Sequence, residues 1–200
     1  MREPFVEFMK RELAAKTVLI ACGLPASYKT ETTEVIADIR GYTILRSDLI
    51  RLEVLKNEDI FDEKVAANMK KRTLVYDEMF RMADELAAEE KAVILDATFV
   101  TQALRRRAAD VAARHNMQLV IQQTQCPKEV SLRRISQRTK ENYESNALTE
   151  QAYTNNVKKF EPVDLDDLKT LYPDLSIIHL LVDTTSDLTE EWFVIGKVTR

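Results

Sequence analysis

The sequence predicts an α/β domain whose parallel sheet is covered by helices on both faces. Apolar runs of strand length alternate with longer segments of helical periodicity along the chain. Runs that are apolar throughout are typical of parallel strands, because such strands are buried on both faces. No repeat, low-complexity tract or linker divides the sequence, so residues 1–200 are expected to form a single domain.

Five apolar runs predict the strands, at residues 17–22, 42–46, 92–96, 118–124 and 177–182. A helix is expected over residues 30–40, because Gly41 supplies a C-terminal stop. Between the second and third strands, apolar residues from Val65 to Ala87 recur at a spacing close to 3.6 residues. This spacing predicts one long amphipathic helix or two abutting ones. Pro127 suits the start of the helix that follows the fourth strand.

Two further segments complete the predicted organisation. Residues 1–16 are expected to form a short charged helix ahead of the first strand. Residues 139–149 are polar and lie between two helical patterns, so they are expected to form a mobile loop.

Composition narrows the class of protein. The chain is 45% hydrophobic and 31% charged, which indicates a globular protein rather than a disordered one. Its net charge of −4 provides no overall basic field for nucleic acid. No apolar stretch is long enough to span a bilayer, and the acidic residues near the start leave no hydrophobic signal core. The two cysteines suggest neither a disulfide framework nor a metal site. A cytoplasmic protein without membrane contact is therefore expected.

The segment Gly-Leu-Pro-Ala-Ser-Tyr-Lys-Thr at 23–30 departs at one position from the phosphate-binding pattern G-x-x-x-x-G-K-[ST]. Tyr28 stands where the second glycine belongs. The loop lies between an apolar run and a helix, where backbone N–H groups and a helix N-terminus can hold phosphate oxygens. Lys29 is expected to reach the β- and γ-phosphates, and the Thr30 hydroxyl to bind Mg²⁺. The alternative is a strand–helix turn in which Lys29 is a solvated surface lysine.

Asp96 ends the third apolar run, in the segment Val-Ile-Leu-Asp-Ala-Thr. A carboxylate at the carboxyl end of a strand, beside a phosphate loop, can hold Mg²⁺ directly or through water. Capping of a helix is the alternative role for Asp96. The hydroxyl of Thr98 is a candidate contact to phosphate or substrate, although a turn role fits equally well.

Ser47-Asp48-Leu-Ile-Arg51 opens the helix after the second strand. At that edge, Asp48 can accept a proton from an attacking hydroxyl, and Arg51 can hold an anionic group of the substrate. Helix capping by Ser47 or Asp48 is again the simpler alternative.

Two clusters of arginines complete the candidate residues. Arg134 and Arg138 lie four residues apart on one helix face, upstream of the polar loop, where they can neutralise charge on a transferred phosphoryl group. The run 105–107 is expected to be a solvated face, with a local nucleic-acid patch as the alternative. Neither histidine shows metal-ligand spacing, and His179 is expected to be packed within a strand.

In order along the chain, the segments GLPASYKT, SDLIR, VILDATF, LRRISQR and KKFEPVD resemble the P-loop kinase-like family often described as an AAA-type ATP-binding domain. Relatives in that family include polynucleotide 5′-hydroxyl kinases, zeta-toxin-like kinases and gluconate-kinase-like enzymes. The resemblance spans about residues 17–183. It implies a three-layer P-loop fold with a five-stranded parallel sheet of order 2-3-1-4-5 and a small helical lid at about 134–150. It also implies ATP with Mg²⁺ as the phosphoryl donor.

The same resemblance assigns roles to individual residues. Asp48 is the candidate base, Arg51 and Thr98 are candidate substrate contacts, and Arg134 and Arg138 belong to the lid. Mg²⁺ is assigned to Thr30 and Asp96. The nucleotide-binding set is Gly23, Ala26, Ser27, Tyr28, Lys29, Thr30 and Glu31. Family members usually carry glycine at positions 26 and 28, so Ala26 is a mild departure and Tyr28 a larger one.

The sequence thus favours an ATP-dependent kinase that acts on a hydroxyl of a small molecule. A nucleotide-binding protein with weak or absent catalysis is the first alternative, because Tyr28 alters the phosphate loop. A kinase of polynucleotide 5′-hydroxyl ends is the second, although the net negative charge disfavours it. The acceptor and the oligomeric state stay open.

Overall fold

The structure, a computed structural model, describes residues 1–56, 68–138 and 149–200. The strands are β1 (Glu3–Pro4), β2 (Thr17–Cys22), β3 (Thr43–Arg46), β4 (Val93–Asp96), β5 (Gln118–Gln125), β6 (Ile177–Asp183) and β7 (Phe193–Thr199). The α-helices are α1 (Phe5–Glu12), α2 (Lys29–Arg40), α3 (Ser47–Val54), α5 (Met69–Ala88), α6 (Gln102–Arg114), α7 (Lys128–Ser136), α8 (Glu150–Lys159) and α9 (Leu165–Leu171). A 3₁₀ turn, η1, covers Thr189–Glu191.

One sheet runs through the molecule in the order β1-β7-β6-β5-β2-β4-β3. The strands β3, β4, β2, β5 and β6 are mutually parallel, whereas β7 pairs antiparallel with β6 and β1 antiparallel with β7. The predicted five-stranded, wholly parallel sheet is therefore wrong, because the sheet is mixed and has seven strands in the described part of the chain, whereas the predicted order 2-3-1-4-5 is confirmed for the five parallel strands. The five parallel strands are those that the apolar runs predict.

The two additional strands lack the signal that identified the others. β1 contains only two residues, which is too short for any periodicity. β7 lies between β1 and β6, and its last three residues are exposed, so its sequence is not continuously apolar. Strands of this kind depend on pairing with an existing sheet rather than on burial of both faces.

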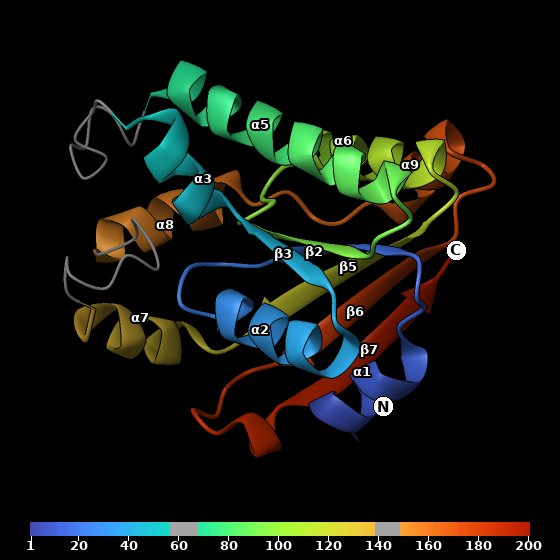
Figure 1. Ribbon diagram of the computed structural model, residues 1–200. Helices are drawn as coiled ribbons and strands as arrows, with labels where there is room; N and C mark the ends of the chain where they lie inside the picture. The colour runs from blue at the N-terminus through green and yellow to red at the C-terminus, as the bar shows by residue number, and fades with distance from the viewer. Residues whose placement is uncertain (57–67, 139–148) are drawn as a thin grey trace.

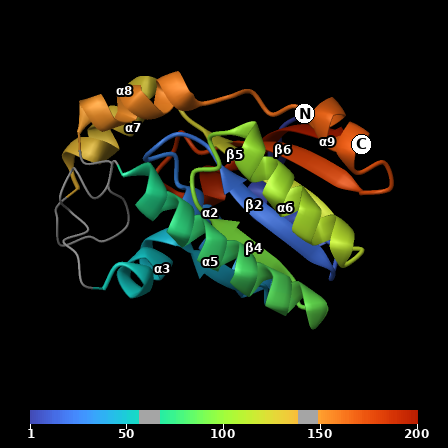
Figure 2. The same cartoon turned by 90° about the horizontal axis from the view of Figure 1, so that it is seen from above.

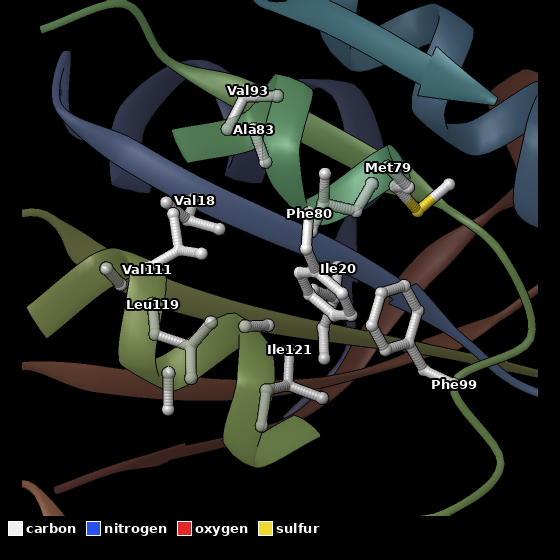
Figure 3. Close-up of a cluster of buried hydrophobic side chains, with 14 of the residues drawn as sticks. Val18, Ile20, Met79, Phe80, Ala83, Val93, Phe99, Val111, Leu119 and Ile121 are labelled. Atoms are coloured by element: carbon white, nitrogen blue, oxygen red, sulfur yellow. The ribbon is translucent and has the colours of Figure 1, made fainter. Parts of the chain in front are cut away.

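Helices cover both faces of the sheet, as Figure 1 shows, with α5, α6 and α9 on one side and α1 and α2 on the other. All six residues of β2 are buried. Val18, Ile20 and Cys22 face the core under α5 and α6, while Leu19 faces the core under α1 and α2. Figure 3 shows Val18 and Ile20 among the side chains of the first core. Continuous burial of β2 is the reason that its sequence is apolar at every position.

The helices begin and end close to the predicted positions. Gly41 ends α2 with φ 69°, and its N–H donates to the Ala37 carbonyl at 2.7 Å. The side chain of Asn68 caps α5 by accepting the N–H groups of Lys70 and Lys71. Val65, the first apolar residue of the predicted long helix, lies outside the described residues, as do residues 139–148 of the predicted mobile loop and lid.

Three helices gather beyond the carboxyl ends of the parallel strands. Figures 1 and 2 show α3, α7 and α8 at this end of the sheet, where the loop between β2 and α2 also lies. Open α/β sheets bind their ligands at this edge. Within the described residues, no helix combines the length and the apolar composition needed to cross a membrane.

Candidate active site

The loop between β2 and α2 adopts left-handed backbone conformations at both positions where the family carries glycine. Ala26 has φ 59° and Tyr28 has φ 56°. Each such residue costs about 1–2 kcal/mol when a Cβ atom is present. Gly23 has φ 144°, and a Cβ atom there would lie 2.6 Å from the Thr124 carbonyl oxygen. Glycine is therefore present at position 23, where a side chain would clash with Thr124, whereas the backbone is strained at Ala26 and Tyr28.

Contacts made by the Tyr28 side chain compensate for that strain. Its ring lies 3.7 Å from the guanidinium carbon of Arg134 and 5.5 Å from the Trp192 ring. Its hydroxyl donates to the Asp187 carboxylate at 2.9 Å. A cation–π contact and a charge-assisted hydrogen bond each stabilise by about 1–2 kcal/mol when partly shielded from water. Tyr28 is thus held against α7 and the segment after β6.

Lys29 opens α2 and points back across the loop. Its ammonium group donates to the Leu24 carbonyl at 2.7 Å. Burial lowers the pKa of Lys29, the Asp96 carboxylate opposes that shift, and the charge of Arg138 adds to it. The predicted phosphate-binding lysine therefore lies near Asp96 and Arg138, in a position from which it can exchange its carbonyl partner for a phosphate oxygen.

Thr30 and Asp96 meet directly. The Thr30 hydroxyl donates to the Asp96 carboxylate at 2.7 Å, and Asp96 is only 5% exposed. The contact follows from topology, because β2 and β4 are neighbours and Ala21 pairs with Asp96. Burial raises the pKa of Asp96, whereas the Thr30 hydrogen bond and the charge of Lys29 lower it. A carboxylate and a hydroxyl form an all-oxygen donor pair, which fits Mg²⁺.

Asp48 lies beside this pair and is bound to an arginine that sequence reasoning missed. The guanidinium group of Arg46 contacts the Asp48 carboxylate at 3.1 Å and that of Glu34 at 3.1 Å. Arg46 ends β3 and is the register partner of Asp96. The negative charge of Asp48 raises the pKa of Asp96, so the two carboxylates are electrostatic neighbours. The signal in the sequence was a charged residue at the carboxyl end of a predicted strand.

Arg51 is within electrostatic range of a second arginine, on the neighbouring helix. Burial lowers the pKa of Arg51, and the like charge of Arg72 on α5 lowers it further. Tyr76, one turn after Arg72, raises the pKa of Arg51 and packs against Phe99. Arg72 was missed because its electrostatic influence on Arg51 arises only when α3 and α5 pack together. Thr98 is half-buried, two residues after Asp96.

Arg134, one of the two predicted lid arginines, is bound on several sides by groups within the chain. Arg134 is only 6% exposed. Its guanidinium group donates to the Asp187 carboxylate at 2.8 Å, the Ala26 carbonyl at 3.2 Å and the Thr184 carbonyl at 2.9 Å. Arg134 therefore ties α7 to the phosphate loop and to the segment after β6. Arg138 is the predicted lid arginine whose charge acts on Lys29.

Each arginine of the run 105–107 on α6 has a partner elsewhere in the chain. Arg105 is fully buried and donates to the carbonyl groups of Pro162 and Glu161 at 2.9 and 2.8 Å. Arg106 pairs with Asp167, and Arg107 pairs with Asp77 while lying over the Phe80 ring. The expectation of a solvated face is wrong for Arg105. The alternative of a nucleic-acid patch has no support from this geometry, because each guanidinium group already has an internal partner.

A hollow of about 290 Å³ adjoins the loop between β2 and α2 on the side of α7 and α8. Residues from the loop, the end of β5, α7 and the end of α8 enclose it: Gly23, Leu24, Ser27, Gln123, Thr124, Gln125, Cys126, Ser131, Val157 and Phe160. The Ser27 hydroxyl donates to the Leu24 carbonyl at 2.8 Å and contacts the Thr124 hydroxyl at 2.7 Å. The negative charge of Glu31 raises the pKa of Lys29. Of the predicted nucleotide-binding residues, Gly23 and Ser27 line this hollow.

A family model described as an AAA domain matches residues 18–163. The chain belongs to this P-loop kinase-like family. No curated protein sequence matches the chain. The matched range contains Lys29, Thr30, Asp48 and Asp96, so the residues gathered at the sheet edge lie inside the part of the chain that the family model covers.

Solved structures of similar fold include several kinases. A sugar kinase from Janibacter sp. HTCC2649 is 17% identical, with a TM-score of 0.60, and the match covers 84% of this chain and 86% of that one. A gluconokinase from Sinorhizobium meliloti 1021 is 15% identical, with a TM-score of 0.59, over 88% and 86%. The AvrRxo1-ORF1:-ORF2 complex with ATP is 15% identical, with a TM-score of 0.64, over 98% of this chain and 62% of that one. At these identities the likeness establishes the fold.

Proposed function

We propose that the protein is an ATP- and Mg²⁺-dependent phosphotransferase that acts on a hydroxyl group of a small molecule. The observation that carries the proposal is the convergence of Lys29, the Thr30–Asp96 pair and Asp48 at the carboxyl edge of the parallel strands. Kinases among the structures of similar fold, and the bound ATP in one of them, support the choice of reaction.

The donor phosphates would lie on the loop at the N-terminus of α2. Backbone N–H groups and the positive end of the helix dipole favour an anion there. Lys29 would release the Leu24 carbonyl and bind a phosphate oxygen. Thr30 and Asp96 would hold Mg²⁺, which neutralises charge on the phosphates when it is bound. Arg138 would add positive charge from the lid side.

The acceptor hydroxyl would approach Asp48. The acceptor oxygen forms a bond to the γ-phosphorus, the bond from that phosphorus to the β–γ bridging oxygen breaks, and ADP leaves. Asp48 takes the hydroxyl proton, with Arg46 holding the carboxylate in place. Arg51 and Arg72 would bind an anionic group of the acceptor, since the charges of both Arg72 and Asp48 act on the pKa of Arg51. Thr98 would contribute a hydroxyl contact.

Calorimetric titration with ATP and Mg²⁺ tests the first half of the proposal. We expect micromolar binding that is lost in Lys29→Ala. Turnover of ATP should then rise when hydroxyl-bearing acceptors are supplied, and Asp48→Asn should abolish that rise while sparing ATP binding.

Other outcomes separate the alternatives. Binding of ATP without stimulation by any acceptor would support a nucleotide-binding protein instead. Labelling of a 5′-hydroxyl oligonucleotide would support an end kinase. Absence of ATP binding in the unaltered protein would overturn the proposal.

A further inference from the structure

We propose that Tyr28 determines donor specificity, by occupying a stacking surface beside the phosphate loop so that the donor is recognised through its polyphosphate and not through its base. The inference rests on the proposed function, because it concerns the donor of that same site. It starts from the departure that the loop shows from its family, a tyrosine in place of a glycine.

The Arg134 guanidinium plane lies at the edge of the loop. It donates to the Ala26 carbonyl at 3.2 Å, two residues before Tyr28. Five further contacts to carbonyl groups and to Asp187 fix the orientation of the plane. A flat group held this rigidly beside a phosphate loop is a suitable surface for a nucleobase, because bases bind to proteins by stacking on aromatic rings and guanidinium planes.

Tyr28 already covers that surface. Its ring centre lies 3.7 Å from the guanidinium carbon, which is the spacing of a stacked pair. Trp192, the second flat group at this edge, lies 5.5 Å from the Tyr28 ring, is only 2% exposed and packs edge-on against Phe5 at 6.0 Å. Among the described residues at this edge, Tyr28 therefore covers a face of the Arg134 guanidinium group, and the Tyr28 ring in turn contacts Trp192 at an interplanar angle of 37°.

Displacement of Tyr28 by a base would be costly. The ring would give up its hydrogen bond to Asp187 and its contacts with both Arg134 and Trp192. These contacts come from α7, from the segment after β6 and from Trp192, so a rotamer that moves the ring away from Arg134 gives up all three. A base that binds here gains little, because it replaces one stacked ring with another.

The consequence is weak discrimination between donors. One stacked base normally contributes a factor of about 5–150 in affinity. Without that contribution, the phosphate groups bound by Lys29 and the loop dominate recognition. ATP, GTP and inorganic tripolyphosphate should therefore bind with similar affinity.

The test is calorimetry of three Mg²⁺-loaded ligands, ATP, GTP and tripolyphosphate, with the full chain. We expect dissociation constants within about threefold of one another. Tyr28→Gly uncovers the Arg134 plane and should bind ATP at least about tenfold more tightly than tripolyphosphate. Tyr28→Phe is the matched comparison, because it keeps the ring over Arg134 and loses only the hydrogen bond to Asp187; whatever its absolute affinities, its three dissociation constants should stay within about threefold of one another. Trp192 is the single tryptophan of the chain, so its fluorescence reports whether the ligand moves the Tyr28 ring.

The outcomes are distinguishable. If the unaltered protein prefers one nucleotide over tripolyphosphate by more than about tenfold, the inference fails while the proposed function stands. A change of Trp192 fluorescence on ATP binding, absent with tripolyphosphate, would also overturn it, since a base would then displace Tyr28. If none of the three ligands binds, the proposed function and the inference fall together. Should Tyr28→Gly not fold, the comparison of ligands on the unaltered protein and on Tyr28→Phe still decides.

Discussion

Replacement of Arg134 by methionine should destabilise the fold, because this arginine is a structural tie as well as a predicted lid residue. Methionine preserves the length of the side chain and removes every donor. The buried carbonyl groups of Ala26 and Thr184 then lose their charged partner, and the Tyr28 ring loses its cation. The remaining carbonyl partners lie in the segment after β6, where residues are more exposed and water can replace the guanidinium group.

The magnitude follows from these contacts. Each buried carbonyl left without its donor costs about 1–2 kcal/mol, and loss of a desolvated cation–π contact costs about 1–2 kcal/mol. We therefore expect the free energy of unfolding to fall by about 4 kcal/mol, most of it from the two buried carbonyl groups, since the Asp187 carboxylate is exposed and can be rehydrated. For a chain of this size, that loss lowers the Tm by about 8–16 °C.

Urea denaturation followed by Trp192 fluorescence measures the effect, with Arg133→Met as the control. Arg133 contacts the same Asp187 carboxylate at 2.8 Å, but it is 52% exposed. Exposed ion pairs contribute less than about 1 kcal/mol, so this variant should resemble the unaltered protein. Equal and small losses in the two variants would refute the assignment of Arg134 as a structural tie. Loss of ATP turnover at unchanged stability would return Arg134 to the lid role that the family resemblance implies.

Three further predictions concern single residues. Burial lowers the pKa of His179 to about 4, so between about pH 6.5 and 4 the unfolded chain binds a proton that the folded chain does not. The free energy of unfolding should therefore fall by about 1–2 kcal/mol as the pH is lowered through that window, after allowance for partial exposure. His179→Gln, placed beside Gln123, should flatten the pH dependence of urea denaturation. Cys22 is buried and its thiol has a raised pKa, while Cys126 is only half-buried, so a thiol reagent should modify one cysteine in the native protein and two in denaturant. Rapid modification of both cysteines in the native protein would contradict the packing of β2. Glu90 has φ 58° at an exposed turn, a left-handed conformation that glycine adopts without strain, so Glu90→Gly should raise the Tm by about 2–4 °C. Thermal denaturation measures this gain, and a lowered Tm would disprove the prediction.

The sequence by itself determined the parallel core of the fold and the position of the loop. Continuous apolar runs such as 17–22 identify strands buried on both faces, and this property belongs to the run alone. Gly23, Lys29 and Thr30 specify the loop, because the motif is local and its strand–loop–helix setting is visible in the sequence. The proximity of Thr30 and Asp96 follows from neighbouring parallel strands, whose carboxyl ends share one edge.

Only the tertiary structure decided what the remaining residues do. Whether Tyr28 would fill the loop or lie outside it depended on Arg134, Asp187 and Trp192, which follow it by more than 100 positions in the chain. The sequence predicts that Arg105 belongs to a solvated run of arginines, yet Arg105 is buried against the carbonyl groups of segment 160–162. β7 and β1 form because a sheet edge is present to pair with them. Local patterns encode burial and backbone conformation, whereas the partners of a charged or aromatic side chain are fixed by long-range packing, which no local pattern contains.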